Sequence, residues 1–120
     1  MKVLLVEDDP DIQLVARTAL KRSGFIVTVT SNGPAALEQV RNDRPDAILL
    51  DWMLPDMDGT EVCRRLKEDP ATAHIPIIFL TARSQQSEIA RGLALGAAGY
   101  IVKPFDALAL GTQVREMLAR

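Results

Sequence analysis

Carboxylate, hydroxyl and ammonium side chains follow four short apolar runs of the sequence. They stand at Glu7-Asp8-Asp9, Asp51, Thr81 and Lys103. Each of these residues alone is more often a helix cap or a turn former, so the ordered set is what carries information. Carboxylates that share a small site repel one another and take up protons unless a cation lies among them. Oxygen ligands suit a hard cation such as Mg2+, and a carboxylate can attack a phosphoryl group to give an aspartyl phosphate. The set therefore indicates phosphoryl chemistry beside a metal ion.

Five apolar runs can position these side chains. They cover residues 3–6, 25–29, 47–50, 77–80 and 100–102, and their length and composition predict strands. The first, third and fourth are almost continuously apolar, which is typical of parallel strands covered by helices on both faces. The second run is followed by Thr30-Ser31-Asn32, which carry no charge, so we expect this strand at an edge of the sheet.

The segments between the strands have helical spacing and recognisable ends. Asp9-Pro10 and Pro34 can begin helices, Ser84 and Asp106 can cap the last two, and Gly24 and Gly96 stand where helices end. Gly111 is a weak point inside the last helix, costing about 1 kcal/mol relative to Ala. The residues predicted to face the core are Ile12, Val15, Ala16, Ala19, Leu20, Ala36, Leu37, Val40, Val62, Cys63, Leu66, Ile89, Ala90, Leu93, Leu110, Val114, Met117 and Leu118.

Strict alternation of five strands with five helices predicts an α/β fold with a parallel sheet and right-handed crossovers. Ligands of such sheets bind outside the carboxyl ends of the strands, where the polar residues above are expected. The 120 residues fit one domain, residues 1–120. The formal net charge of -2 gives no general attraction to nucleic acid or to an anionic membrane.

Other classes are excluded by composition. Cys63 is the single cysteine, which rules out an internal disulfide and a cysteine-based metal site. No apolar run approaches the roughly 20 residues of a membrane span. The apolar residues at the N-terminus run directly into Glu7-Asp8-Asp9, so we interpret them as a strand rather than a signal peptide. We expect a cytoplasmic protein with no membrane contact and no direct nucleic acid contact.

Over its whole length the sequence resembles the receiver domains of bacterial response regulators. The matching motifs are Val6-Glu7-Asp8-Asp9, residues 49–55 with Asp58-Gly59, Leu80-Thr81-Ala82-Arg83, Gly96-Ala97, and residues 100–105 including Lys103-Pro104. Receivers of transcription-factor response regulators are most similar in motif. The resemblance implies a flavodoxin-like, doubly wound sheet of order 2-1-3-4-5, and a phosphoryl-accepting signalling domain rather than an enzyme.

The resemblance also implies a role for each site residue. Asp51 would accept the phosphoryl group, Thr81 would donate a hydrogen bond to it, and Lys103 would pair with it. A Mg2+ or Mn2+ ion would bind to Asp8, Asp51 and the backbone carbonyl of Met53, with Glu7 acting through water. A cis bond is implied before Pro104, and Tyr100 would be the aromatic residue that turns inward when Thr81 moves.

Partners follow from the same resemblance. A histidine kinase or a phosphotransfer domain would supply the phosphoryl group. An output domain or partner protein would bind the face of the fourth helix, fifth strand and fifth helix. A phosphorylation-dependent homodimer is possible for such domains, but Gly96-Ala97-Ala98-Gly99 replaces the usual Gly-Ala-Asp-Asp and removes acidic residues used in that dimer. The chain could be a stand-alone receiver or part of a longer protein.

Three alternatives remain beside this interpretation. Asp56-Met57-Asp58-Gly59-Thr60 matches the D-x-D-G-T signature of haloacid dehalogenase-like phosphatases, although Asp51, not Asp56, ends the apolar run. A flavodoxin-like flavin binder shares the fold, but its phosphate would be repelled by Glu7-Asp8-Asp9. A degenerate receiver would serve only protein interaction, yet every acceptor, metal, hydroxyl and lysine position is filled.

The resemblance further suggests which side chains control hydrolysis. Met53 and Arg83, two residues after the acceptor and two after Thr81, would flank the approach of the attacking water. An apolar Met cannot orient water and a long Arg can cover the entrance. We therefore expect a long-lived phosphoryl group and slow self-dephosphorylation.

Overall fold

Strands and helices alternate along the chain in the computed structural model, which describes residues 1–82 and 86–119 without the side chains of residues 86 and 88. The strands are β1 (Lys2–Val6), β2 (Ile26–Thr30), β3 (Ala47–Asp51), β4 (Ile77–Thr81) and β5 (Gly99–Val102). The helices are α1 (Pro10–Arg22), α2 (Gly33–Asn42), α3 (Gly59–Glu68), α4 (Gln86–Ala94) and α5 (Leu110–Leu118).

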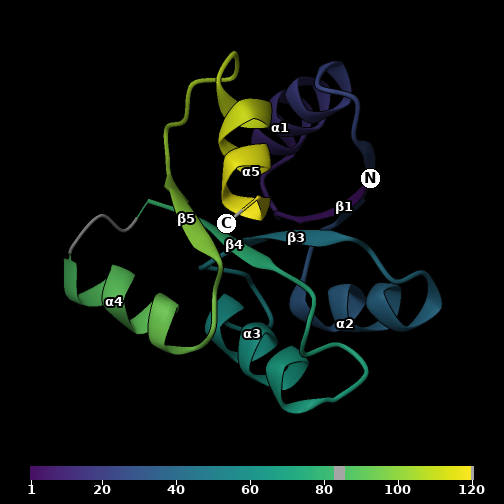
Figure 1. Ribbon diagram of the computed structural model, residues 1–120, viewed down its shortest axis with the longest axis vertical. Helices are drawn as coiled ribbons and strands as arrows, with labels where there is room; N and C mark the ends of the chain where they lie inside the picture. The colour runs from purple at the N-terminus through teal and green to yellow at the C-terminus, as the bar shows by residue number, and fades with distance from the viewer. Residues whose placement is uncertain (83–85, 120) are drawn as a thin grey trace.

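All five strands are parallel and form one sheet in the order β2-β1-β3-β4-β5 (Figure 1). The order reverses between β1 and β3, which places a topological switch point at their carboxyl ends. The predicted fold class, strand order and edge position of β2 are confirmed.

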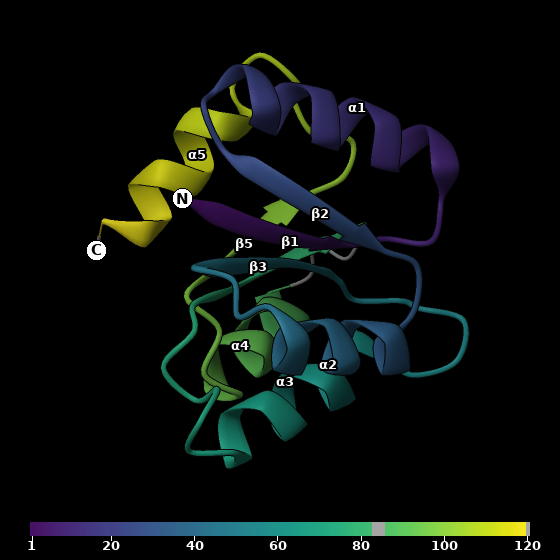
Figure 2. The same cartoon turned by 90° about the vertical axis from the view of Figure 1, so that its right-hand side faces the viewer.

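Helices cover both faces of the sheet, with α1 and α5 on one side and α2, α3 and α4 on the other (Figure 2). Side chains of a strand alternate between the two faces, and β1 shows this clearly. Leu4 and Val6 pack in the core beneath α2 and α3, whereas Val3 and Leu5 pack in the core beneath α1 and α5. Burial on both faces explains why the runs that form β1, β3 and β4 are almost continuously apolar.

The start of α1 and the ends of α1 and α4 follow the predicted signals. The Asp9 carboxylate accepts hydrogen bonds from the backbone amides of Asp11 and Ile12, and Pro10 occupies the first position of α1. Gly24 after α1 and Gly96 after α4 have φ angles of +92° and +97°, a conformation that favours glycine.

The predicted inward face of α4 is wrong in part. Ala90 is exposed and the Leu93 side chain is 46% exposed, whereas Gly92 is buried. A Cβ atom on Gly92 would lie 3.0 Å from the indole of Trp52 and 3.3 Å from the Phe79 ring. The helix thus approaches the sheet through a residue without a side chain, which an apolar pattern does not register. Val15 of α1 is likewise 45% exposed rather than buried.

The start of α5 also differs from the prediction. Asp106 does not cap this helix, which begins at Leu110 after Ala109 and has no side-chain cap. The Asp106 carboxylate instead accepts from the backbone amide of Leu108, closing a turn before the helix. Gly111 stands where a Cβ atom would lie 1.8 Å from the Ser23 hydroxyl, so close packing against the end of α1 requires this glycine.

Two other expectations concern the end of the chain and the fourth helix. Met117 and Leu118 are only partly buried against the core, not fully buried as predicted. Ser84, the expected cap of α4, lies outside the described residues. Among the described residues, no helix has both the length and the apolar character that crossing a membrane requires.

Candidate functional site

Four strands deliver polar residues to one edge of the sheet. Asp51 is the last residue of β3 and Thr81 is the last residue of β4. Glu7 follows β1 directly, and Lys103 follows β5. Because the strands are parallel, these residues all lie at the carboxyl edge, at the switch point of the topology.

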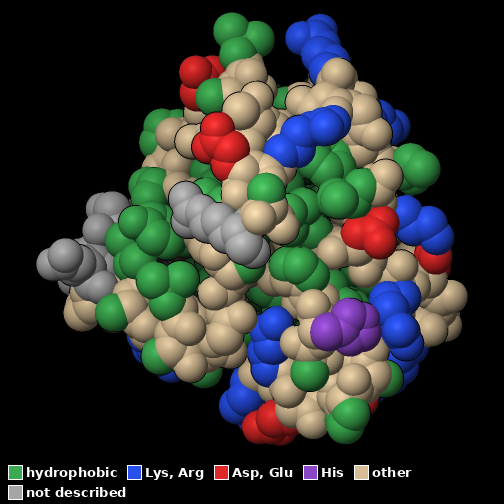
Figure 3. Space-filling model, in the orientation of Figure 1, with side chains coloured by type: hydrophobic (Ala, Val, Ile, Leu, Met, Phe, Trp, Pro, Cys, Tyr) green, Lys and Arg blue, Asp and Glu red, His purple; other side chains and the backbone are tan. Residues whose placement is uncertain are grey.

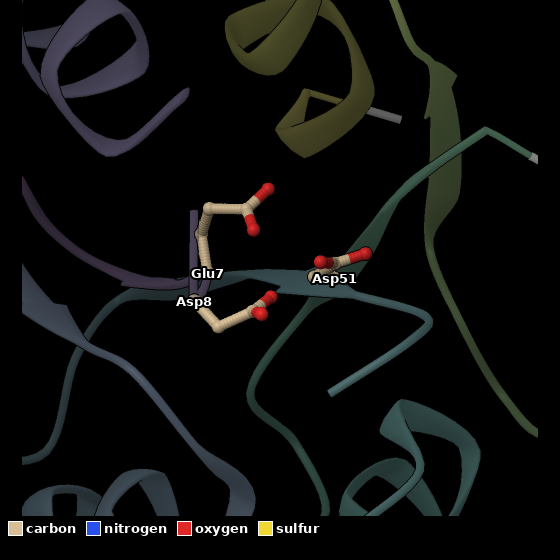
Figure 4. A group of neighbouring side chains, drawn as sticks. All are labelled: Glu7, Asp8 and Asp51. Atoms are coloured by element: carbon tan, nitrogen blue, oxygen red, sulfur yellow. The ribbon is translucent and has the colours of Figure 1, made fainter. Parts of the chain in front are cut away.

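Three carboxylates meet there, on Glu7, Asp8 and Asp51. One oxygen of each lies within 4.8 Å of the others. Figure 4 shows Asp8 and Asp51 on the ends of neighbouring strands, with the Glu7 side chain turned to the opposite side of β1 from Asp8. Glu7 is fully buried and Asp51 is 6% exposed, whereas Asp8 is exposed to solvent. The cluster is therefore a shallow acidic site with one accessible ligand.

Lys103 neutralises part of this charge. Its ammonium lies 2.5 Å from Oε1 of Glu7 and 3.2 Å from Oδ2 of Asp51. Its backbone amide donates to the carbonyl of Thr81 over 2.7 Å, which continues the β4–β5 pairing past the end of β5. The Lys103–Pro104 bond is cis, as predicted.

The electrostatics leave Asp51 poorly compensated in the absence of a metal ion. Burial, a hydrogen bond with Glu7 and the charge of Glu7 raise the pKa of Asp51 to about 7, and Lys103 only partly opposes this. Burial lowers the pKa of Lys103, but hydrogen bonding and attraction to Glu7 and Asp51 outweigh it, so the net shift is upward. Lys103 is thus charged at neutral pH, and it pairs with both buried carboxylates, those of Glu7 and Asp51.

The donor set fits a hard divalent cation. Its ligand atoms are carboxylate oxygens, and the exposed carboxylate of Asp8 keeps contact with water. Among the described residues, Lys103 is the cation that pairs with the buried Glu7 and Asp51. Mg2+ characteristically binds through one or two carboxylates while retaining several waters. Such an ion would supply the charge that the raised pKa of Asp51 indicates is missing.

The chain after Asp51 folds closely around the acceptor. The Met53 amide lies 3.3 Å from Oδ1 of Asp51, and the Gly59 amide donates to the Trp52 carbonyl over 2.8 Å. A Cβ atom on Gly59 would lie 2.2 Å from the carbonyl oxygen of Asp51. Only glycine permits this approach of α3 to the strand end. The Asp58-Gly59 motif identified Gly59 in the sequence, but the close approach that requires glycine is visible only in the structure.

The Asp-x-Asp-Gly-Thr segment has a structural role instead of a nucleophilic one. Asp58 is the N-cap of α3, where its carboxylate accepts from the Thr60 amide at 3.0 Å. Asp56 is exposed and lies beyond the strand. This arrangement disfavours the phosphatase alternative, because the residue at the strand end is Asp51.

Thr81 and Tyr100 lie on adjacent strands near a small cavity. Thr81 is 3% exposed, and the Tyr100 side chain is 37% exposed. Both line a cavity of about 10 Å³, together with Trp52, Phe79, Ile89, Gly92, Leu93 and Gly99. The Trp52 and Phe79 rings pack with centroids 4.8 Å apart at its base. Thr81 and Tyr100 therefore line the same small cavity, which is about the size of one water molecule.

Met53 and Arg83 were predicted to control hydrolysis, and the structure describes the first of them. The side chain of Met53 is 63% exposed beside Asp51. Arg83 lies outside the described residues.

Gln13 was missed by sequence reasoning. Its side-chain amide donates to the backbone carbonyl of Glu7 and to the Ser31 hydroxyl, the latter over 3.2 Å. A half-buried glutamine in an amphipathic helix has no pattern of its own, so only the folded structure reveals this contact.

A family model described as "Response regulator receiver domain" matches residues 3–115. The chain is 44% identical over 119 residues to the phosphate regulon transcriptional regulatory protein PhoB of Rhizobium meliloti, covering 99% of this chain and 52% of that protein. It is 43% identical over 118 residues to the transcriptional regulatory protein CseB of Streptomyces coelicolor, covering 98% and 49%. The chain spans about half the length of the curated relatives it matches.

Solved structures show the same likeness. A putative response regulator from Chloroflexus aurantiacus superposes with a TM-score of 0.92 at 34% identity, covering 99% of this chain and 98% of that one. The chemotaxis response regulator CheY4 of Vibrio cholerae gives 0.91 at 29% identity, with 97% of both chains covered.

Proposed function

Because this chain belongs to the response regulator receiver domain family, we propose that Asp51 accepts a phosphoryl group from the phosphohistidine of a histidine kinase or phosphotransfer domain. The relatives are transcriptional regulators, and the domain family acts in two-component signalling. We propose that the receiver domain comprises residues 1–120 and that it acts in the cytoplasm. One observation carries the chemistry: the buried carboxylate of Asp51 lies 3.2 Å from the Lys103 ammonium and beside the carboxylates of Glu7 and Asp8.

In the transfer, a carboxylate oxygen of Asp51 attacks phosphorus, the phosphorus–nitrogen bond breaks, and the donor histidine leaves with that electron pair. Lys103 stays charged and pairs with a phosphoryl oxygen, so its contact with Asp51 is exchanged for one with the product. The hydroxyl of Thr81, at the end of the neighbouring strand, donates a hydrogen bond to another phosphoryl oxygen. Positioning and charge neutralisation of this kind account for most of the catalysis in phosphoryl transfer.

The metal ligands proposed for Mg2+ (or Mn2+) are Asp8, Asp51 and the backbone carbonyl of Met53, with Glu7 acting through water. The ion supplies neutralisation of the charge that develops on the phosphoryl oxygens. Glu7 is buried and its carboxylate is held by Lys103 and by the backbone amide of Asp9. Its part is therefore to fix Lys103 and the metal's water rather than to reach the ion.

The switch that follows is proposed to use Thr81 and Tyr100. Movement of Thr81 toward the phosphoryl group would enlarge the cavity that both residues line, and the half-exposed Tyr100 ring would turn inward to fill it. Burial of an aromatic ring from water favours the inward position. The state of Asp51 would thus be converted into the shape of the surface over α4 and β5.

We assign the output contact to the face formed by α4, β5 and α5. Figure 3 shows hydrophobic side chains gathered over α4 and β5, where Leu93 and Tyr100 are exposed. A separate output domain or partner protein would bind there, and a phosphorylation-dependent homodimer would use the same face. No direct nucleic acid contact is proposed for the receiver, in keeping with its net charge of -2.

Reaction with a small phosphodonor tests the central assignment. Acetyl phosphate with Mg2+ is expected to add one phosphoryl group to the chain, and Asp51→Asn is expected to prevent the addition. Mass spectrometry of the intact chain measures both.

A further inference from the structure

We propose that Gln13 is a positioning residue for the metal site, which holds the main chain around Asp8 so that its carboxylate faces Asp51. The inference rests on the proposed function, because it concerns the affinity of that site for Mg2+. Gln13 belongs to α1, and its side-chain amide donates to the Glu7 carbonyl and the Ser31 hydroxyl rather than to Asp8 or Asp51. Its influence would pass through backbone atoms.

Pairing of the sheet ends just before Glu7. The last registered pair of β1 and β2 is Val6 with Thr30, and the Glu7 amide makes one more bond, to the Thr30 carbonyl at 3.0 Å. The Glu7 carbonyl lies beyond this pairing and receives its hydrogen bond from the side-chain amide of Gln13. The Gln13 side chain of α1 thus satisfies the first carbonyl group beyond the β1–β2 pairing.

Gln13 holds both neighbours of Asp8. Its backbone amide donates to the carbonyl of Asp9 over 2.9 Å, as the first turn of α1 requires. Its side chain donates to the carbonyl of Glu7, on the other side of Asp8. Asp8 is exposed, so its direction toward the cluster depends on the main chain that carries it.

The same side chain connects the neighbouring loop. Nε2 of Gln13 lies 3.2 Å from the hydroxyl of Ser31, the first residue after β2. That contact is exposed, whereas the contact with Glu7 is partly buried. A hydrogen bond shielded from water restrains its partners more strongly, so the bond to Glu7 is the one expected to set the geometry.

Residues that orient metal ligands without touching the ion typically change metal affinity by 10–100-fold when removed. Gln13→Met is the informative variant, since Met has a similar length and helix propensity but no donor. It should raise the Kd for Mg2+ by about tenfold. Ser31→Ala removes only the exposed contact and should leave the Kd unchanged. Gln39→Ala is a matched control, because Gln39 is a half-buried helical glutamine beside Lys2 and Pro45, at the opposite end of β1.

The experiment is a thermal unfolding series of each chain in EDTA and at increasing Mg2+, from which the Kd follows by mass action. A larger Kd in Gln13→Met, with the native Kd in Ser31→Ala and Gln39→Ala, is the expected result. An unchanged Kd in Gln13→Met would overturn the inference even if Tm in EDTA fell, because that pattern marks a merely structural role. An equal loss in Ser31→Ala would also overturn it, by placing the effect in the other hydrogen bond.

Failure of the proposed function gives a different pattern. If Mg2+ did not stabilise the native chain, the metal site itself would be refuted, and the role of Gln13 with it. If Mg2+ stabilised the native chain and Gln13→Met alike, only the role of Gln13 would be refuted.

Discussion

The Lys103 ammonium and the Glu7 carboxylate, 96 residues apart in the sequence, form an ion pair at 2.5 Å with the Glu7 side chain 1% exposed. The pair joins the carboxyl ends of β1 and β5, which are separated in the sheet by β3 and β4. Truncating one partner of such a pair leaves an uncompensated buried charge. The ion pair therefore links the carboxyl ends of β1 and β5 at the site, through two residues that are proposed to act in phosphoryl transfer.

Replacing Asp8 by Ala should separate metal binding from stability. Asp8 adds an exposed negative charge to a cluster that already holds Glu7 and Asp51. The variant should unfold in EDTA at the native Tm or above it, since like-charge repulsion is reduced. Its Tm should no longer rise with Mg2+.

Asp9→Ala is the control for this variant. Asp9 caps α1, so its loss should cost about 1 kcal/mol of unfolding free energy, while the rise of Tm with Mg2+ persists. A large loss of stability of Asp8→Ala in EDTA would show instead that Asp8 is a structural cap.

Metal-free stability should fall as pH rises through the neutral range. The pKa of Asp51 is raised from 3.8 to about 7 in the folded chain, so between these values the folded state binds more protons than the unfolded state. The stability that this proton provides is complete below about pH 4 and is lost as the pH passes 7. Unfolding by urea in EDTA, at several pH values, measures the slope.

Asp51→Asn removes this titration and should flatten the pH profile relative to the native chain. Saturating Mg2+ should flatten it as well, since the ion competes with the proton for the cluster. Parallel profiles for the native chain and Asp51→Asn in EDTA would contradict the electrostatic account.

Gly59→Ala should destabilise the chain by about 1–3 kcal/mol, the usual cost of overpacking. The added Cβ atom would meet the Asp51 carbonyl oxygen at 2.2 Å, so β3 and α3 must separate. Helix propensity alone predicts the opposite sign, because Ala is favoured over Gly in a helix. Denaturant unfolding therefore distinguishes the two, and a more stable variant would show that the close approach is not required.

Met53→Asn should shorten the life of the phosphoryl group. Met53 is exposed beside Asp51 and cannot hydrogen-bond to water, whereas an amide could orient a water for attack. Loss of phosphate should become about tenfold faster, which corresponds to roughly 1.4 kcal/mol of barrier. Met53→Leu, which is apolar and of similar size, is the control. Equal rates in Met53→Asn and the native chain would refute this role.

Sequence reasoning reached the strand ends because burial on both faces gives strands an unmistakable apolar pattern. The carboxyl edge then follows from topology, which is why Glu7, Asp51, Thr81 and Lys103 could be brought together before any coordinates. Glycines with positive φ, such as Gly24, were also predictable, since helix ends favour them.

The remainder depended on tertiary contacts that have no local signal. Gly92 faces the core because a Cβ atom there would lie 3.0 Å from the Trp52 indole, so Ala90 and Leu93 were wrongly assigned to the inward face of α4. Asp106 closes a turn rather than capping α5, and either role satisfies the same sequence pattern. Gln13 shows the same limit at the site, because its partner is a backbone carbonyl.

Intact-mass measurement after reaction with acetyl phosphate and Mg2+ tests most directly the claim that Asp51 is the phosphoryl acceptor. The native chain should gain one phosphoryl group, and EDTA should prevent the gain. Asp51→Asn should gain none, while Asp56→Asn, which alters an exposed carboxylate of the following loop, should gain one like the native chain. Modification of Asp51→Asn to the native extent, or its loss in Asp56→Asn with Asp51 intact, would contradict the account.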